Sequence, residues 1–311
     1  MEIREINFAV ANICNADCVF CPRSFVKVPV EDRYMPVSLV EKVLSEVTTP
    51  EFQRQHPVCH SVLSENGEPF LNPDILDILR ATRRAGLGIS LFSNFALMGE
   101  SIAETVLREN LVDAIHVNID GATEESYRAV KKLPLDVVSA NLGRFLSIRD
   151  VMKSPVRICI HAMPYKNYHD SVVASYGSAP GKGNGLVPPF DAHLVVAAWG
   201  NRLRAGDFIG VDNALLWAER YGKEARSGDF KCPNIQRVRH CAYINPTGDW
   251  YACCYDMGNE LVLGNVNRRS VLEIANSKAR RVLVDSLESG RFEEIGFPCT
   301  RVDACQTVAV Q

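Results

Sequence analysis

Short apolar runs that alternate with helical patterns are the feature that most limits how this sequence can fold. Each run has the length and continuous hydrophobicity of a parallel strand that is buried on both faces. Alternating strands and helices form a parallel sheet with right-handed crossovers. The 311 residues exceed the usual size of one domain, so a large α/β barrel fits better than a compact sandwich. About six βα units precede residue 200, with predicted strands at residues 6–11, 58–63, 88–94, 114–120, 156–163 and 193–199.

The segments between these runs carry helix start and stop signals. In residues 72–86, Asn72 suits the N-cap, Pro73 suits the first helical position and Gly86 marks the end. Residues 36–47 have a similar helical pattern. The sequence therefore predicts helices that cross between neighbouring parallel strands.

The second part of the chain has a different pattern. Residues 177–190 are rich in glycine and proline, which predicts an irregular loop beside the last strand. Residues 241–254 indicate a hairpin that turns at Thr247 and Gly248, and one helix is expected around residues 270–287. We therefore expect a barrel domain at residues 1–224 and a small C-terminal domain at residues 225–311.

Charge and composition exclude several classes of protein. A formal charge of −3 gives no electrostatic footprint for nucleic acid. No apolar run reaches the roughly 18 residues of a membrane span, and no secretory signal is present, so we expect a cytoplasmic protein without membrane contact. Eleven cysteines in such a chain indicate metal or redox chemistry rather than disulfides.

Three cysteines lie close together after the first predicted strand, at Cys14, Cys18 and Cys21. Thiolates favour zinc, copper(I) or iron–sulfur clusters, and three of them leave one metal position without a protein ligand. A structural zinc site would need a fourth ligand from elsewhere in the chain. The alternative is an iron–sulfur cluster with one open iron.

Four segments resemble the radical S-adenosylmethionine (SAM) enzymes, and they occur in that family's order. The spacing Cys-x3-Cys-x2-Cys, with Phe20 before the last cysteine, is similar to the family signature. Residues 64–73 resemble its Gly-Gly-Glu-Pro motif, with Asn66 in place of the first glycine. Residues 92–94 and 117–130 resemble the ends of the following strands. The resemblance implies a partial (βα)6 TIM-like barrel with a small twitch- or SPASM-like iron–sulfur extension.

The resemblance also implies where the cofactors bind. Cys14, Cys18 and Cys21 would hold a [4Fe-4S] cluster whose open iron binds SAM, which explains the missing fourth cysteine. The protein would supply placement of the cofactor and exclusion of water. Structurally, the polar residues among the SAM contacts could instead cap strand ends. The expected SAM contacts are Phe20, Asn66, Gly67, Glu68, Pro69, Ser93, Asn94 and Asn118.

The tail resembles the SPASM and twitch extensions, which bind auxiliary clusters. Cys232, Gly248 and Cys253 match the opening of that pattern, and Cys299 and Cys305 complete four ligands for one auxiliary [4Fe-4S] cluster. The spacing of the last two cysteines departs from the pattern. Cys241 could replace Cys232, and a structural zinc ion is the alternative occupant.

The remaining cysteines have different expected roles. Cys59 and Cys159 lie in predicted apolar strands and are expected to be buried small hydrophobic residues. Side chains alternate along a strand, so Cys254 should point away from Cys253, toward the barrel mouth. There it could act catalytically by returning a hydrogen atom, although a Cys-Cys pair is common in this extension whatever the reaction.

The resemblance implies hydrogen abstraction from a carbinol carbon of a sugar or aminocyclitol, as in antibiotic biosynthesis. We expect epimerisation with Cys254 as hydrogen donor, or alternatively dehydrogenation with the auxiliary cluster as electron acceptor. Peptide maturation is a third possibility, and only thirteen residues before Cys14 argue against it. Outside enzymology, an electron-transfer or structural zinc protein would share the cysteines. A flavodoxin- or ferredoxin-type protein is the expected electron donor.

Overall fold

The computed structural model describes residues 1–18, 21, 23, 34–64, 66–162, 191–211, 232, 234–256, 258–296 and 299. Its strands form one nine-stranded sheet in the order β6-β5-β4-β3-β2-β1-β7-β8-β9. They are β1 (Glu5–Phe8), β2 (His60–Leu63), β3 (Gly88–Ser93), β4 (Ala114–Asn118), β5 (Arg157–Ala162), β6 (Phe208–Val211), β7 (Cys241–Ile244), β8 (Asp249–Tyr251) and β9 (Val262–Asn265).

The helices follow the strands in the expected alternation. The α-helices are α1 (Val37–Val47), α2 (Pro50–Gln55), α3 (Ile75–Arg84), α4 (Glu100–Arg108), α5 (Glu124–Lys131), α6 (Leu135–Met152), α8 (Ala192–Trp199), α10 (Ile235–His240), α11 (Val271–Ala275) and α12 (Lys278–Ser289). Short 3-10 helices in the described residues include η2 (Pro69–Leu71), η3 (Gly200–Arg202) and η4 (Phe292–Glu294). None of the helices described is long and apolar enough to cross a membrane.

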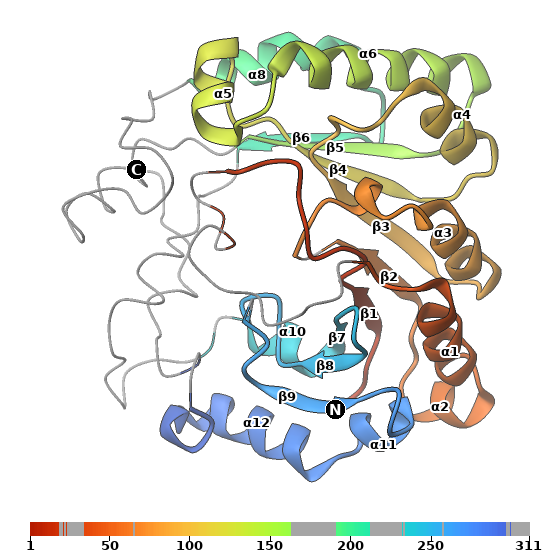
Figure 1. Cartoon of the computed structure of the whole chain (residues 1–311), viewed down its shortest axis with the longest axis vertical. Coiled ribbons are helices and arrows are strands. Elements are labelled where there is room, and N and C mark those ends of the chain that lie inside the picture. The colour runs from red at the N-terminus through yellow and green to blue at the C-terminus, as the bar shows by residue number, and fades with distance from the viewer. Residues whose placement is uncertain are drawn as a thin grey trace.

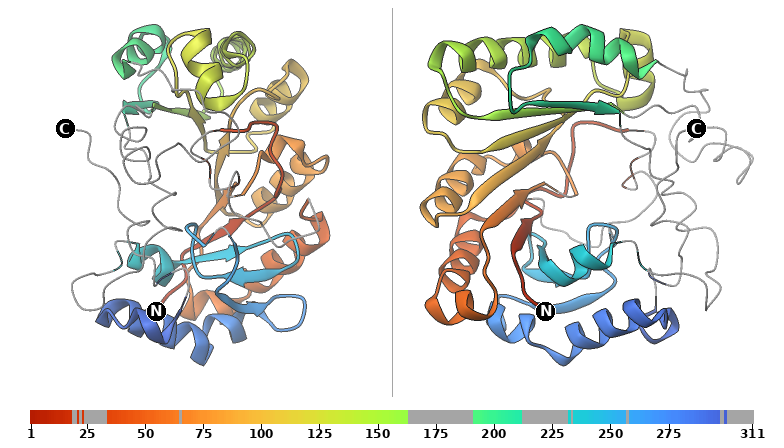
Figure 2. Two further views of the ribbon diagram at one scale, coloured as in Figure 1. Left: turned by 60° about the vertical axis from the view of Figure 1, so that its left-hand side comes forward. Right: turned by 180° about the vertical axis from the view of Figure 1, so that it is seen from behind.

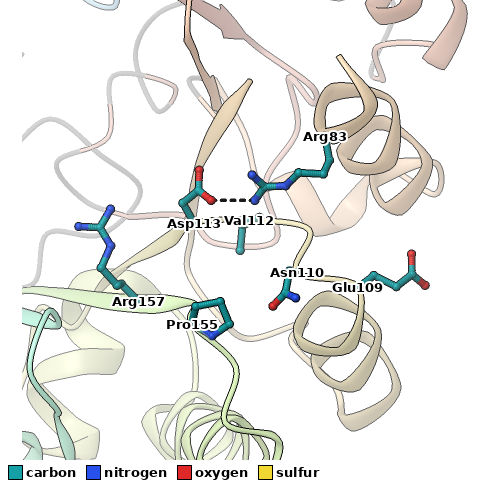
Figure 3. Close-up of a pocket in the computed structure, with 7 residues that line it drawn as sticks. All are labelled: Arg83, Glu109, Asn110, Val112, Asp113, Pro155 and Arg157. Atoms are coloured by element: carbon teal, nitrogen blue, oxygen red, sulfur yellow. Dashed lines mark hydrogen bonds and ion pairs between the residues drawn. The ribbon is translucent and has the colours of Figure 1, made fainter. Parts of the chain in front are cut away.

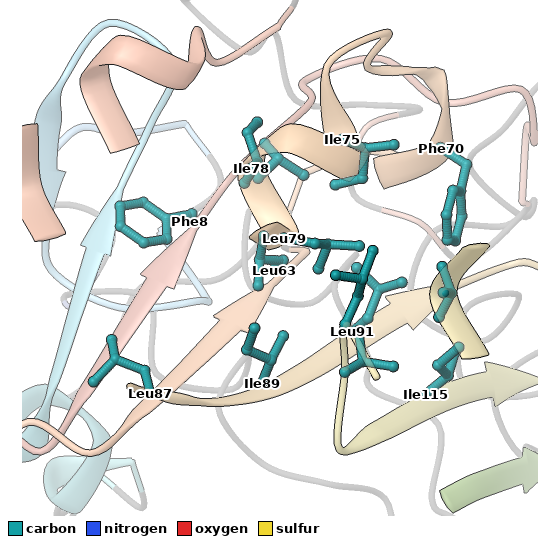
Figure 4. Packing of buried hydrophobic residues seen from close by; sticks show 14 of the residues in the cluster. Phe8, Leu63, Phe70, Ile75, Ile78, Leu79, Leu87, Ile89, Leu91 and Ile115 are labelled. Atoms are coloured by element: carbon teal, nitrogen blue, oxygen red, sulfur yellow. The ribbon is translucent and has the colours of Figure 1, made fainter. Parts of the chain in front are cut away.

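Strands β1 to β6 pair in parallel and curve into an open barrel, with the helices on the convex side (Figures 1 and 2). This confirms the predicted α/β fold with a mostly parallel sheet. Alternate residues of each strand pack beneath the helices in one large apolar core, which Figure 4 shows around Leu63, Ile89, Leu91 and Ile115. The intervening residues face the concave side, called here the lumen.

The sixth predicted strand is wrong. Residues 193–199 form most of helix α8, which begins where the Asp191 side chain accepts a hydrogen bond from the His193 backbone N–H at 2.9 Å. A short apolar run has the same hydrophobicity in a buried helix and in a buried strand, so periodicity could not separate them. The sixth strand is β6, which pairs with β5. The predicted loop at residues 177–190 lies outside the described residues.

The start of the helix predicted at residues 72–86 also needs correction. Helix α3 begins at Ile75 after Asp74, whereas the Asn72 amide donates hydrogen bonds to the carbonyls of Val10 (2.8 Å) and Met35 (3.0 Å). Asn72 therefore ties this loop to the segment after β1, and its side-chain oxygen also accepts from the Asp74 backbone N–H at 2.9 Å just before the helix. Gly86 has a φ of +79° just past the helix, as the stop signal predicts.

The C-terminal hairpin is confirmed, and it continues the barrel sheet. Strands β7 and β8 are antiparallel and turn at Thr247 and Gly248, where Gly248 has a φ of +85°. Strand β7 also pairs in parallel with β1, so the extension adds three strands to the open edge of the barrel. The single helix expected around residues 270–287 is two helices, because the chain breaks at Asn276 and Ser277 starts α12 as N-cap.

Candidate active site at the carboxyl ends of the strands

The three clustered cysteines lie in the loop that follows β1, and each is half-buried. Burial raises the pKa of all three thiols, that of Cys18 to about 12, and the neighbouring thiols raise the pKa of Cys18 and Cys21 further. The thiols are therefore close enough to disfavour one another's ionisation, which a bound metal would reverse. The Cys21 backbone N–H donates to the Cys18 carbonyl at 3.1 Å and closes the loop.

The donor set of this loop is three thiols, the ligand type that iron–sulfur clusters take. In the part of the chain that the structure describes, no three His, Cys, Asp or Glu side chains converge as they would around one ion. A [4Fe-4S] cluster takes its thiolates at separate irons, so its ligands do not converge on one point.

Glu68 is the centre of a buried hydrogen-bond network beside the cysteine loop. Its carboxylate accepts from the Ser93 hydroxyl at 2.7 Å and from the Asn94 backbone N–H at 2.8 Å. The Asn94 amide in turn donates to the Asn15 side chain at 2.7 Å and lies 3.7 Å from the Cys14 sulfur. Burial raises the pKa of Glu68, and these hydrogen bonds oppose the rise. The structure thus brings three of the predicted SAM contacts to one side of the cysteine loop.

Asn66 and Gly67 attach this network to the cysteine loop. A Cβ on Gly67 would lie 2.2 Å from the Ile13 carbonyl oxygen, and the Glu68 backbone N–H donates to the same oxygen at 2.9 Å. Asn66 is 1% exposed, and neither polar atom of its side-chain amide has a hydrogen-bond partner among the described residues. A buried amide without partners is costly, so it fits a position that a bound ligand completes.

Two further predicted SAM contacts, Pro69 and Asn118, are among the described residues. Pro69 is buried at the start of η2, and Asn118 ends β4, next to His161 on β5. Phe20 and Cys305 lie outside the described residues.

An ion pair between Asp120 and Lys131 was not predicted from the sequence. The Lys131 ammonium donates to the Asp120 carboxylate at 3.0 Å, and both side chains are almost completely buried. The Cys18 sulfur lies 3.9 Å from the Lys131 carbonyl oxygen, so the pair is adjacent to the cysteine loop. These residues follow the Asn118 strand end, but nothing in their spacing marked them as part of the site.

A row of four rings crosses the lumen on strands β3 to β6. Phe92 stacks on His116 with ring centroids 4.2 Å apart, His116 is 5.2 Å from His161, and His161 is 5.6 Å from Phe208. The two imidazoles share a hydrogen bond, with Nδ1 of His116 2.9 Å from Nε2 of His161. The histidines are 45 residues apart in sequence, so only the register of β4 and β5 reveals the pair.

Two of the cysteines expected in the apolar core are placed differently. Cys59 is exposed. It lies just before β2, which begins at His60, and so it is not part of the strand. Cys159 is half-buried in β5 and lies beside His116 in register. The expectation that both are buried is therefore wrong, and Cys159 carries a thiol on the luminal face.

The cysteines of the extension gather in a second apolar cluster. Cys232, Cys241 and Cys253 are buried there, and Cys254 and Cys299 pack against the same cluster. The Cys241 thiol lies 3.4 Å from the Glu5 carboxylate, and burial together with that carboxylate raises its pKa to about 12.

The geometric reason for separating Cys254 from Cys253 is not met. Strand β8 ends at Tyr251, so both cysteines lie in the turn that follows, where side chains do not alternate. Cys254 is less buried than Cys253 and interacts electrostatically with Arg237. Its distance from the reacting carbon therefore depends on the turn rather than on a strand face.

One pocket lies at the opposite end of the barrel strands (Figure 3). It has a volume of about 450 Å³ and is lined by Arg83, Glu109, Asn110, Val112, Asp113, Pro155 and Arg157. The amino ends of barrel strands serve stability, whereas catalytic groups collect at the carboxyl ends. We therefore assign the active site to the carboxyl-end residues described above.

Two family models match this chain. The model of the radical SAM superfamily matches residues 8–170, and that of the SPASM iron-sulfur cluster-binding domain matches residues 232–305. Both confirm the resemblance seen in the cysteine motifs. A probable GTP 3',8-cyclase from Methanocaldococcus jannaschii is 26% identical over 163 residues, which cover 52% of this chain and 51% of that protein. The chain thus matches about half the length of this curated relative.

Solved structures share the fold along most of the chain. The crystal structure of BtrN in complex with AdoMet and 2-DOIA has a TM-score of 0.56 at 16% identity, and covers 100% of this chain and 96% of that one. SuiB of Streptococcus suis bound to precursor peptide SuiA has a TM-score of 0.61 at 14% identity, with coverages of 98% and 76%. The anSMEcpe structure with bound AdoMet has a TM-score of 0.54 at 14% identity, with coverages of 97% and 84%.

Proposed function

Because this chain belongs to the radical SAM superfamily, we propose that it abstracts a hydrogen atom from a carbinol carbon of a sugar or aminocyclitol. Membership implies a [4Fe-4S] cluster that binds SAM, and the SPASM match implies an auxiliary cluster. When reduced, the bound cofactor supplies a 5′-deoxyadenosyl radical. The residues of the chain bind and orient the substrate and exclude water.

The main support for a sugar or aminocyclitol substrate is the row of four aromatic rings in the lumen. Phe92 is 36% and Phe208 is 46% exposed, so both ends of the row present an aromatic face to the lumen. Such a face packs against the C–H side of a sugar ring, and the imidazoles offer nitrogen atoms to its hydroxyl groups. Asn118 adds a side-chain amide, and it is the register partner of His161 on the neighbouring strand β5. An apolar surface with a few polar groups is typical of small-molecule sites.

We further propose that Cys254 gives a hydrogen atom to the substrate radical and so forms the epimer. The Cys254 thiyl radical left behind would return to the thiol with one electron from the flavodoxin- or ferredoxin-type donor and one proton from water. Five cysteines of the extension share one apolar cluster, whereas one auxiliary cluster needs four ligands. With Cys305 also available in the sequence, a thiol is left for chemistry. Cys254 and Cys299 are the half-buried cysteines of this cluster, and Cys254 interacts electrostatically with Arg237, which suits exchange with a substrate better than the buried Cys253.

Dehydrogenation is the second candidate, and the same cluster favours it. If Cys254 is a ligand of the auxiliary cluster, it would not serve as hydrogen donor. The auxiliary cluster would then accept an electron from the substrate radical, and the product would be a ketone. The hydroxyl proton would then pass to the imidazole pair. BtrN, similar over nearly its whole length, was crystallised with AdoMet and a further compound, 2-DOIA.

The reconstituted enzyme should be tested anaerobically with SAM and a panel of sugars, aminosugars and aminocyclitols. A substrate is recognised by 5′-deoxyadenosine above the background without substrate. No response to the panel, together with a response to short peptides, would replace the polyol proposal with peptide maturation. The genes beside this one would narrow the panel.

Deuterated water then separates the two outcomes. Epimerisation predicts solvent deuterium in the product, and predicts that Cys254→Ala makes 5′-deoxyadenosine but no epimer. Cys159→Ala tests the luminal thiol of β5 in the same way, and Cys59→Ala, which removes an exposed thiol, is the matched control. A ketone without deuterium supports dehydrogenation, and unchanged epimerisation by Cys254→Ala removes this residue from the mechanism.

A further inference from the structure

Glu5 is a half-buried carboxylate on β1 that the proposed chemistry does not use. Ile6 and Phe8 belong to the core beneath the helices, so alternation along the strand places Glu5 and Asn7 on the concave face. Strand β1 lies between β2 and β7 in the sheet (Figure 1). Glu5 and Asn7 therefore face the lumen where the barrel meets the extension.

The Glu5 carboxylate has hydrogen bonds on one oxygen only. Its Oε1 atom accepts from the Asn7 side-chain amide at 2.9 Å and lies 3.4 Å from the Cys241 sulfur. Among the described residues, no group donates a hydrogen bond to the Oε2 atom. One carboxylate oxygen is therefore left for a ligand.

The neighbouring cationic residues do not neutralise this carboxylate. His60 is the register partner of Glu5 on β2, but its ring contacts the Ser90 hydroxyl at 3.1 Å. Arg237 on α10 interacts electrostatically with Cys241. Within the described ranges, Glu5 forms no ion pair with His60, Arg237 or any other cationic side chain. Because burial weakens the hydration of a charge, a positively charged ligand would stabilise such a carboxylate.

Asn7 adds a second acceptor beside the carboxylate. Asn7 is 0% exposed, and its side-chain oxygen has no hydrogen-bond partner among the described residues. The nitrogen of the same amide donates to Glu5, so the oxygen lies close to the carboxylate. A buried acceptor without a donor is costly until a ligand supplies one. Both side chains thus accept hydrogen bonds, and one of them carries a negative charge.

This pair of acceptors lies at the depth of the imidazole pair in the lumen. Asn7 lies one residue and Glu5 three residues before the end of β1. His116 lies two residues before the end of β4, and His161 lies one residue before the end of β5. The carboxyl ends of barrel strands gather at one rim. A substrate that packs on the aromatic rings is therefore level with Glu5 and Asn7.

We propose that Glu5 and Asn7 bind an ammonium group of the substrate, which makes the substrate an amino sugar or an aminocyclitol rather than a neutral sugar. This inference rests on the proposed function and narrows its substrate class. An ammonium group brings three N–H donors and one positive charge, so it satisfies the carboxylate and the amide oxygen together. A hydroxyl group at the same position brings one donor and no charge.

Kinetics with matched pairs of compounds test this proposal on the reconstituted full-length enzyme with SAM. scyllo-Inosamine and scyllo-inositol differ only in one amino group, as do glucosamine and glucose. The amine should give a kcat/KM for 5′-deoxyadenosine formation at least about tenfold above that of its neutral partner, since only the amine forms a charge-assisted hydrogen bond. Glu5→Gln should abolish this preference through KM. Glu2→Gln, which removes an exposed carboxylate paired with Arg4, should retain it.

The outcomes separate this inference from the proposed function. Equal kcat/KM for amine and neutral partners, or an unchanged preference in Glu5→Gln, would overturn the ammonium site and leave the proposed function standing. If neither pair is turned over, the amines of the wider panel and their neutral partners take their place. No response to any polyol would refute the proposed function, and this inference with it.

Thermal unfolding of the reconstituted enzyme tests the site without a substrate. Glu5→Gln keeps an acceptor oxygen for Asn7 and removes the unpaired charge, so the unfolding midpoint should stay the same or rise. Glu2→Gln is again the matched control. A clearly lower midpoint for Glu5→Gln alone would mean that the protein already supplies a counter-charge, which would overturn the proposal.

Discussion

The two ends of the barrel strands treat their charged and polar groups in opposite ways. At the amino ends, Asp113 accepts from Arg83 at 2.9 Å and from the Ile89 backbone N–H at 2.7 Å (Figure 3). Asp207 accepts from Arg149 and from the Ile158 backbone N–H in the same manner. Each carboxylate joins a guanidinium to the start of a strand, so its charge stabilises the fold.

At the carboxyl ends Asp120 and Lys131 form a buried ion pair, but several other polar groups are buried there without an ion-pair partner among the described residues. The Asn66 amide lacks partners among the described residues, and burial raises the pKa of Glu68 and of the three loop thiols. Each of these groups would gain from a bound cluster or from SAM. These buried polar groups lower the stability of the carboxyl ends, whereas the paired charges stabilise the amino ends. Substitutions at the two ends should therefore have different consequences.

The largest expected effect is loss of cofactor chemistry when a loop thiol is removed. Cys18→Ala should leave a cluster with too few ligands, so SAM cleavage to 5′-deoxyadenosine should fall to background. Thermal unfolding of the protein without clusters should change little, because Cys18 is only half-buried. Cys59→Ala, at the amino-end side of β2, should keep full cleavage activity. A Cys18→Ala variant with wild-type activity would remove this loop from the active site.

The second effect is a loss of stability at the amino ends. Arg149 and Asp207 are both fully buried and form two contacts of 2.8 and 2.9 Å. Arg149→Met would leave the carboxylate without its partner, which costs about 3–5 kcal/mol of unfolding free energy. Urea unfolding measures the loss, and Arg84→Met, which breaks an exposed pair with Glu41, should change it by less than about 1 kcal/mol. Equal effects of the two variants would contradict the assigned difference.

The third effect again concerns the carboxyl ends. Gly67→Ala should displace the cysteine loop, because the new Cβ would overlap the Ile13 carbonyl oxygen. A misplacement of about 1 Å can reduce a rate roughly 100-fold, so SAM cleavage should fall by about that factor. Gly99→Ala is the matched control, since a Cβ there meets nothing within 4 Å. The two variants should differ in cleavage rate far more than in unfolding free energy.

The sequence was most informative where the residues of a site are neighbours along the chain. Cys14, Cys18 and Cys21 share one loop, and residues 64–73 lie on one short segment, so each local motif was enough to carry the family resemblance that pointed to these cysteines and to Glu68. The 2.9 Å contact of His116 with His161 and the pairing of β1 with β7 join distant segments, and no local pattern encodes either. Both depend on strand register, which the whole sheet sets.

The errors have similar causes. Residues 193–199 are apolar enough for a strand or a buried helix, and the cap at Asp191 decided for the helix. Cys254 was assigned a face from strand alternation, but β8 ends before it. Element boundaries are weakly encoded by short segments, and a shift of two residues changes where a side chain points.

The smallest expected effect tests the amino ends by pH. Arg83 and the Ile89 N–H hold the pKa of Asp113 below its usual value although burial alone would raise it. A lowered carboxylate pKa stabilises the folded protein above the pKa of the unfolded chain, near 4, and this contribution is lost as the pH falls through the folded pKa. Asp113 is 42% exposed, so solvent screening limits the contribution to about 1 kcal/mol or less.

Urea unfolding of wild type and Asp113→Asn at pH 7 and pH 3 measures this contribution. The variant should be less stable at pH 7, and the difference should shrink at pH 3 because the wild-type carboxylate begins to take up a proton there. Asp77→Asn removes a more exposed carboxylate that contacts Arg80, and it should show a smaller difference at both pH values. If the difference in unfolding free energy between wild type and Asp113→Asn instead grew on acidification, the carboxylate would not stabilise the strand starts through its charge.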